Sequence, residues 1–262
     1  MAVHTDTKSH EDLIRIAWHL ESKSDDPHGC VCAAGDGQSM QRTMQMKRMH
    51  PDRYRHFLIV CGNFHGFGHF IFAVHQSFYD CYCGLFAKIL HREKVPKHIV
   101  DFRDDSFRHA LAHHLEITIG TFEYFTSDVQ HPPNDMLLSN PLLYDSMIQS
   151  AGGKVAFKYL LHGGNPILHW LRAQRKGDGD AVESLHAAAF HMNRATTHKV
   201  NCVLISLLAL WSTTAVEPKI AELVKALVSL SLSGKTLMFV DRLLEYVNLL
   251  QGERDAKFAS FE

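Results

Sequence analysis

Two apolar segments of the chain are each followed by side chains that can bind a metal ion. Asp36 closes the stretch 30–36 (CVCAAGD), and Asn63 and His65 follow the stretch 55–62 (RHFLIVCG) by one and three residues. If both stretches are parallel neighbouring strands, their carboxyl ends meet at the sheet edge where ligands bind in open α/β folds. Because oxygen ligands suit Mg²⁺, the pattern predicts a metal site that includes Asp36, Asn63 and His65. The alternative is a plain turn, in which Asp36 only stabilises the start of a helix.

A late polar stripe is the second candidate for metal chemistry. In DRLLEYVN (241–248), Asp241, Glu245 and Asn248 fall at i, i+4 and i+7 and share one helical face. The stripe either brings an acidic ligand to the sheet edge or forms an exposed polar face.

The stretch GNFHGFGHF (62–70) allows a metal site of a different kind. His65 and His69 are spaced i, i+4, so on a helix they share a face and could bind one transition metal. Gly66 and Gly68 weaken such a helix. The simpler interpretation is a joint between a strand and a helix, in which the two glycines allow a close approach of the backbone.

The 20 histidines are spread along the chain rather than gathered in a tract. Glu183 and His186 form a single Glu-x-x-His, half of the pattern that binds two irons in helix bundles. The adjacent His113 and His114 are interpreted as helix-face histidines without partners. This excess leaves a His-ligated transition-metal or haem protein as an alternative function.

Six cysteines include two Cys-x-Cys pairs, at 30–32 and 81–83. Since the N-terminus has no cationic start followed by an apolar stretch, we expect no secretion signal and interpret the cysteines as reduced, mostly buried thiols. A zinc site that draws on both pairs is the alternative.

The elements that must position these residues are mostly helices. The stretches 30–36 and 55–62 are predicted as buried strands joined by a helix over 37–50, which makes a small parallel βαβ unit. Nearly everything after residue 64 has helical periodicity, beginning with a long apolar segment that predicts a buried central helix. We therefore predict an N-terminal helix and turn over 1–28, and one mainly α domain over 29–262 that contains the small sheet (29–62).

Composition narrows the function classes. The chain has 262 residues, a formal net charge of −1 and an apolar fraction of 46%, which is typical of a globular protein with a substantial core. The longest apolar run, 200–211, is too short to span a membrane, so we expect an intracellular protein, nuclear or cytoplasmic. Bulk charge does not mark a nucleic-acid binder, although a local basic face stays open.

Several motifs, taken in order, resemble a family of transposase-like domains from eukaryotic mobile elements. Gly35-Asp36-Gly37-Gln38 resembles the family's Gly-Asp-Gln-like step, and Gly62-Asn63-Phe64-His65 resembles its Gly-Asp-Phe-His step into a long helix. His198, Lys199 and Asn201 match a helical His-Lys-x-Asn-Tyr region, with Cys202 in place of Tyr. The stretch SLSGKTLMFVDRLLEYVN resembles the closing segment, so the resemblance spans roughly residues 30 to 250.

The resemblance implies an RNase H-like fold with a large helical portion and two Mg²⁺ or Mn²⁺ ions for phosphoryl transfer. It implies that Asp36 and Glu245 are catalytic metal ligands and that His198, Lys199 and Asn201 contact nucleic acid. Two features depart from the pattern. Asn63 stands where the family tends to have Asp, and no apolar strand with a leading carboxylate precedes residue 28. The chain therefore resembles the C-terminal portion of such a domain.

These features predict a transposase-derived, degenerate module that binds nucleic acid, with DNA as the expected partner, or another protein. The alternative is an active two-metal nuclease or transposase, completed by a partner chain or a second copy that supplies the missing carboxylate. No membrane partner is expected.

Overall fold

The computed structural model of the chain describes residues 31–35, 37–54, 57–99, 105–126, 150–196, 203, 206–207, 209–210, 217–226, 229–230 and 238–239. This part of the chain is mainly helical, as the sequence predicts. In chain order its elements are β1 (Val31–Gly35), α2 (Gly37–Met49), β2 (Phe57–Cys61), α3 (Asn63–Phe78), the π-helical turn η1 (Tyr79–Cys83), α4 (Gly84–Ile89), α5 (Asp105–Thr126), α8 (Ala151–Tyr159), the π-helical turn η2 (Leu160–Gly164), α9 (Asn165–Lys176), α10 (Gly179–Ala195), α12 (Pro218–Ala226), β3 (Ser229–Leu230) and β4 (Met238–Phe239).

The chain forms two compact units. Unit 1 comprises 1–66, 173–187 and 199–262, and unit 2 comprises 67–172 and 188–198. The boundary falls inside three helices, α3, α9 and α10, each of which contributes residues to both units. The single domain over 29–262 that the sequence suggests stays a prediction.

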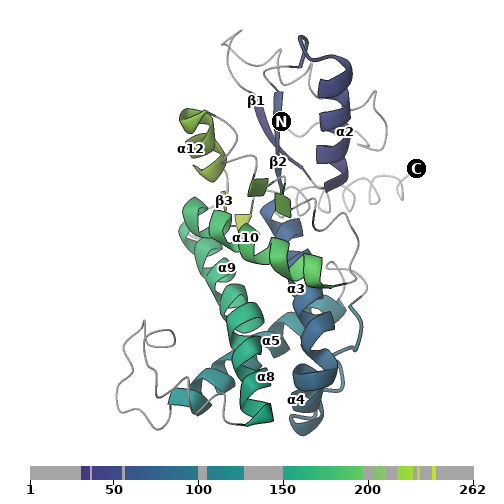
Figure 1. The fold of residues 1–262 in the computed structure, drawn as a ribbon, viewed down its shortest axis with the longest axis vertical. Helices are drawn as coiled ribbons and strands as arrows, with labels where there is room; N and C mark the ends of the chain where they lie inside the picture. Colours follow the sequence, from purple (N-terminus) through teal and green to yellow (C-terminus); the bar gives the residue numbers. More distant parts are fainter. Residues whose placement is uncertain are drawn as a thin grey trace, which may run out of the picture. The chain divides into compact units, whose positions relative to one another are not determined.

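Unit 1 contains a two-stranded parallel sheet that α2 joins and covers (Figure 1). The register runs from Val31 opposite Phe57 to Gly35 opposite Cys61, so both strands end at the same edge. The helix buries Thr43 and Met46, which are one turn apart, because these two positions face the sheet. β3 and β4 form a separate antiparallel pair, with Ser229 opposite Phe239 and Leu230 opposite Met238.

Local turn chemistry separates α9 from α10 within unit 1. Gly177 has φ 66°, a left-handed conformation that glycine adopts at little cost, and Asp178 N–H bonds to Ala173 O at 3.0 Å to close α9. Asp178 then caps α10, since its Oδ1 accepts from Ala181 N–H at 3.0 Å. Helix α12 is held to α10 by Lys225, whose Nζ lies 2.6 Å from Asp180 Oδ1.

Unit 2 is built from two long helical runs, α3–η1–α4 and α8–η2–α9, that pack with α5 (Figure 1). Both π-helical turns pack against α5, and η1 also packs against α8. Gly164 in η2 allows the close approach, because a Cβ there would lie 2.5 Å from Thr118 Oγ1. π-helical turns inside α-helices are often found at functional sites.

Helix α3 supplies much of the core of unit 2, which confirms the predicted burial of the first part of this apolar segment. Phe70, Ile71 and Val74 have no exposed surface, and Phe70 packs with its ring centroid 5.7 Å from that of the buried Trp170. The segment becomes exposed at α4, where Ile89 is 59% exposed. No helix within the described ranges is both long enough and apolar enough to cross a membrane.

Candidate functional site

Of the residues predicted to form a metal site at the sheet edge, the structure describes Asn63 and His65. β1 ends at Gly35 and β2 at Cys61, directly opposite each other, and α3 begins at Asn63. Asp36, the residue after β1 in the sequence, and Glu245 lie outside the described residues. The three residues assigned to nucleic-acid contact, His198, Lys199 and Asn201, also lie outside them.

Asn63 is joined to a histidine from a distant part of the chain. The Nε2–H of His186 in α10 donates to Asn63 Oδ1 at 2.9 Å. Because an amide oxygen can only accept, this nitrogen of His186 must carry the proton. The amide oxygen that the sequence offers as a metal ligand is therefore already bound by a protein side chain.

Gly66 makes this contact sterically feasible. A Cβ at position 66 would lie only 2.8 Å from His186 Cε1, closer than real Cβ atoms approach. The imidazole of His186 is 3% exposed, so it lies against the bare backbone of α3 near the start of that helix. The glycine thus accommodates a side chain of α10, whereas the sequence suggests an approach of helix and strand.

His65 lies on a different side of α3 from Asn63. Two residues along an α-helix correspond to a rotation of about 200°, so the two side chains leave the helix in nearly opposite directions. The His65 ring contacts Phe64 edge-on, with ring centroids 5.9 Å apart. The structure therefore does not bring Asn63 and His65 together as neighbouring ligands.

Glu183, the partner of His186 in the Glu-x-x-His pattern, is engaged in an ion pair. Its Oε2 lies 3.2 Å from Nζ of Lys225, which also contacts Asp180. The hydrogen bond to Asp180, and next in effect the one to Glu183, raise the pKa of Lys225, so this side chain stays charged. Over the described ranges, no three His, Cys, Asp or Glu side chains are grouped closely enough to hold a metal ion.

Unit 2 contains a buried polar cluster that the sequence interpretation missed. We call His75, Cys83, His114, Thr118 and Tyr159 the histidine cluster; all five are at most 2% exposed. His75 Nδ1 lies 3.1 Å from His114 Nε2, and His114 Nδ1 lies 3.0 Å from Tyr159 Oη and 3.8 Å from Cys83 Sγ. Thr118 Oγ1 donates to His114 O at 2.6 Å and lies 3.2 Å from Tyr159 Oη.

One carbonyl fixes the direction of hydrogen bonding through this cluster. His75 Nε2 must be the donor to Pro96 O, 2.8 Å away, because a carbonyl can only accept. In a neutral ring, His75 Nδ1 is then an acceptor, and His114 Nε2–H donates to it. His114 Nδ1 in turn accepts from the Tyr159 hydroxyl or the Cys83 thiol. With both rings neutral, every ring nitrogen of His75 and His114 therefore has a partner.

Burial keeps every titratable member of the cluster neutral. It lowers the pKa of His75, against the raising effect of the bond to Pro96 O, and lowers the pKa of His114 well below its ordinary value. The neighbouring His113 lowers both histidine pKa values further. Burial also raises the pKa of the Cys83 thiol and of the Tyr159 hydroxyl. The cluster therefore stabilises the packing of unit 2 and does not supply an activated nucleophile, because the reactive form of cysteine is the thiolate.

The interpretation of His113 and His114 as partnerless helix-face histidines is wrong. His113 Nε2 donates to Cys83 O at 2.9 Å, and His114 is fully enclosed. The sequence does contain a signal for the burial of His114, because this residue continues the helical spacing of the buried Phe107, Ala110 and Ile117 on α5. Cys83 is buried but Cys81 is exposed, so the expectation of mostly buried thiols fails at Cys81, and this pair does not turn both sulfurs inward.

The edge of the parallel sheet carries a neutral amide bound by a histidine, and unit 2 carries a neutral, closed histidine cluster. Neither provides a preformed nucleophile or a metal cage in the part of the chain that the structure describes. No protein-family model, curated protein or solved structure matches the chain.

Proposed function

We propose that the chain is a transposase-derived nucleic-acid-binding module that has lost strand cleavage. Its origin rests on the resemblance to the transposase-like family, with β1, α2 and β2 as a remnant of an RNase H-like core. The observation that carries the binding function is the charge of α2. This helix contains Arg42, Lys47 and Arg48 and no acidic residue.

Residues 37–55, which include α2, are more basic than the chain as a whole. Residues 37–55 contain five Lys and Arg against one Asp, which leaves 22 Lys and Arg against 27 Asp and Glu elsewhere. Lys47 and Arg48 also complement the negative end of the helix dipole, but Arg42, in the middle of α2, and Arg53, beyond its end, do not have that role. A cationic surface is what the phosphate backbone of DNA or RNA requires.

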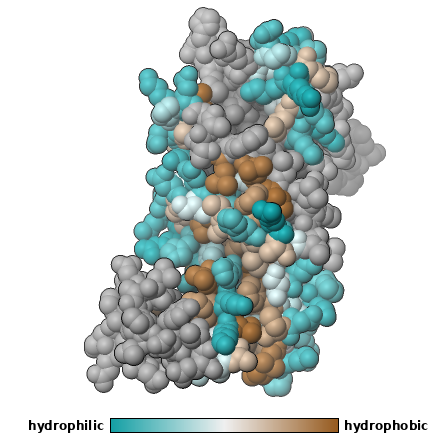
Figure 2. Space-filling view, viewed as in Figure 1, coloured by the Kyte–Doolittle hydropathy of each residue, from teal (hydrophilic) through white to brown (hydrophobic). Residues whose placement is uncertain are grey.

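The exposed side of α2 carries the side-chain types that contact nucleic acid. Gln41, Gln45 and Arg48 are exposed and spaced i, i+4 and i+7, so they share the face opposite the buried Thr43 and Met46. Figure 2 shows hydrophilic side chains over this helix, at the upper right. Arg and Gln side chains both donate to phosphate oxygens.

The state of Asn63 supports the loss of catalysis. An amide carries no charge, so it binds a divalent cation less strongly than the Asp expected there, and its oxygen already accepts from His186. An active Mg²⁺ or Mn²⁺ nuclease, completed by a partner chain or a second copy, is the function that this proposal excludes. It would need Asp36 and Glu245 as ligands.

Salt-dependent DNA binding tests the proposal. Fluorescence anisotropy with a labelled 25-base-pair duplex is measured between 50 and 200 mM NaCl for the parent, for Arg48→Gln and for a matched control, Lys158→Gln, at an exposed position of α8. We expect Arg48→Gln to weaken binding and to lower the slope of log K against log salt by about 1. The control should leave both unchanged.

Cleavage is assayed in the same samples with Mg²⁺ or Mn²⁺. We expect no strand cleavage from the parent, and Asp36→Ala should behave as the parent does. A nucleic-acid function would be contradicted if the parent did not bind DNA at 50 mM NaCl, or if Arg48→Gln and Lys158→Gln changed binding equally. A protein would then be the expected partner. Reproducible cleavage that Asp36→Ala abolishes would show an active nuclease.

A further inference from the structure

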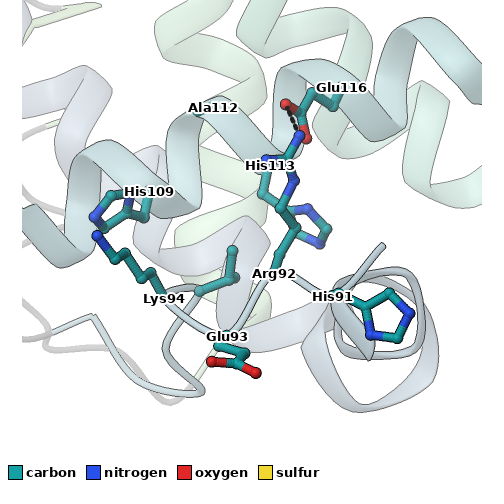
Figure 3. A pocket seen from close by; sticks show the side chains of 9 residues that line it. His91, Arg92, Glu93, Lys94, His109, Ala112, His113 and Glu116 are labelled. Carbon is teal, nitrogen blue, oxygen red and sulfur yellow. Dashed lines mark hydrogen bonds and ion pairs between the residues drawn. The ribbon is translucent and has the colours of Figure 1, made fainter. Parts of the chain in front are cut away.

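A pocket in unit 2 begins where α4 ends and the chain reverses. His91 has φ 50°, a left-handed conformation unusual for a residue with a side chain. In this conformation, the N–H of Arg92 donates to Ala87 O at 2.8 Å and the N–H of His91 donates to Lys88 O at 3.2 Å. These two hydrogen bonds end the helix. The reversal directs residues 91–95 along α5 (Figure 3).

The pocket lies between this loop and one face of α5. Its α5 wall consists of His109, Ala112, His113 and Glu116, spaced i, i+3, i+4 and i+7. Its volume is about 340 Å³, within the range of sites that bind small molecules. Val95 and Ala112 give the lining an apolar part on which a carbon skeleton could rest.

The lining contains two cations, Arg92 and Lys94, and two carboxylates, Glu93 and Glu116, so its formal charges balance but are not all paired. Arg92 is paired with Glu116, with Nη2 and Oε1 2.6 Å apart, so these two charges neutralise each other. Lys94 and His109 point toward one another (Figure 3), and across the described part of the chain neither has a hydrogen bond or an ion pair. The remaining carboxylate of the lining, Glu93, likewise makes no ion pair with a described residue. When His109 presents its N–H to this space, both nitrogen groups can donate to one anion.

The wall of the pocket also contains an incompletely satisfied histidine. His113 is 1% exposed, and its Nε2–H donates to Cys83 O. Its Nδ1 is buried and makes no hydrogen bond with any described residue. In a neutral ring this atom can only accept, so it suits a hydroxyl group or a water and not an anion.

We propose that this pocket binds a small organic phosphate, with the phosphate held between Lys94 and His109 and the carbon skeleton against Val95 and Ala112. A phosphate offers three terminal oxygens to these two nitrogen groups, one more than a carboxylate does, so a third oxygen stays available to water. The pocket is larger than inorganic phosphate requires, so a phosphate ester fills it better than the free ion. This site is independent of the nucleic-acid surface on α2.

Isothermal titration of the full chain at low ionic strength tests the proposal with two probes, glycerol 3-phosphate and inorganic phosphate. We expect saturable one-to-one binding of glycerol 3-phosphate, tighter than that of inorganic phosphate. Losing one charge-assisted hydrogen bond in Lys94→Gln or His109→Gln should weaken binding about 10-fold. Lys158→Gln, an exposed lysine outside the pocket, should bind as the parent does.

Three outcomes would overturn the proposal. The first is the absence of saturable heat with glycerol 3-phosphate. The second is equal weakening by Lys94→Gln and Lys158→Gln, which would indicate nonspecific attraction to surface lysines. The third is binding of inorganic phosphate that is tighter than that of the ester, which would leave an ion site without a place for the carbon skeleton.

Discussion

Lowering the pH from 7.5 to 5.5 should destabilise the fold through His75 and His114. Burial lowers the pKa of both histidines in the folded chain, whereas an unfolded histidine titrates near its ordinary pKa of 6.5. The unfolded state therefore binds protons that the folded state does not, and the free energy of unfolding falls as the pH drops through 6.5. Protonating His75 Nδ1 would also require the proton of His114 to move from Nε2 to Nδ1, where it would donate to Tyr159 Oη.

The size of the effect follows from proton linkage. One pH unit below 6.5, each histidine that stays neutral in the folded state costs about 1.4 kcal/mol, so the pair costs at most about 2.8 kcal/mol at pH 5.5. His75 should contribute the smaller share, because its bond to Pro96 O opposes the lowering of its pKa. His114 is fully enclosed and faces His75 and His113, so it should contribute its full share.

Urea denaturation at both pH values measures this difference. The fluorescence of Trp170, which is buried against Phe67 and Phe70, reports on unit 2. In His114→Gln the amide can still donate and accept but cannot take up a proton, so the loss between pH 7.5 and 5.5 should shrink by about 1.4 kcal/mol. His162→Gln, at an exposed position of η2, should lose as much as the parent. If His114→Gln also lost as much as the parent, the neutral pair would not be the cause.

Two further variants test the backbone features of the sites. His91→Gly should raise the free energy of unfolding by about 0.5–1 kcal/mol because glycine adopts φ 50° without strain, and an unchanged thermal midpoint would argue against strain at the end of α4. Gly66→Ala should cost about 1–3 kcal/mol, because its Cβ would press on His186 at 2.8 Å. Gly120→Ala, on an open part of α5, should instead stabilise by about 0.5–1 kcal/mol, and equal effects of the two alanines would refute the contact with His186.

The sequence predicted the elements better than the contacts between them. Helical periodicity and turn residues act over a few positions, so α5 with its buried stripe and the end of α9 at Gly177 can be read from the chain alone. The same periodicity continues through His114, whose interpretation as a helix-face histidine without partners is nevertheless wrong, because a local pattern carries no information about the groups that face it. Its partners His75 and Tyr159 lie 39 and 45 residues away.

The candidate sites were decided by tertiary packing. Asn63 was identified from its place after an apolar stretch, yet its partner His186 is 123 residues distant and reaches it only because Gly66 leaves room. The pocket between residues 91–95 and α5 depends on a single left-handed residue, His91, which no sequence rule favours at that position. Composition and periodicity determined the mainly helical character of the described residues and the local excess of five Lys and Arg over one Asp at residues 37–55. Hydrogen bonds between distant side chains depend on how close two backbones approach, and only the folded structure determines that distance.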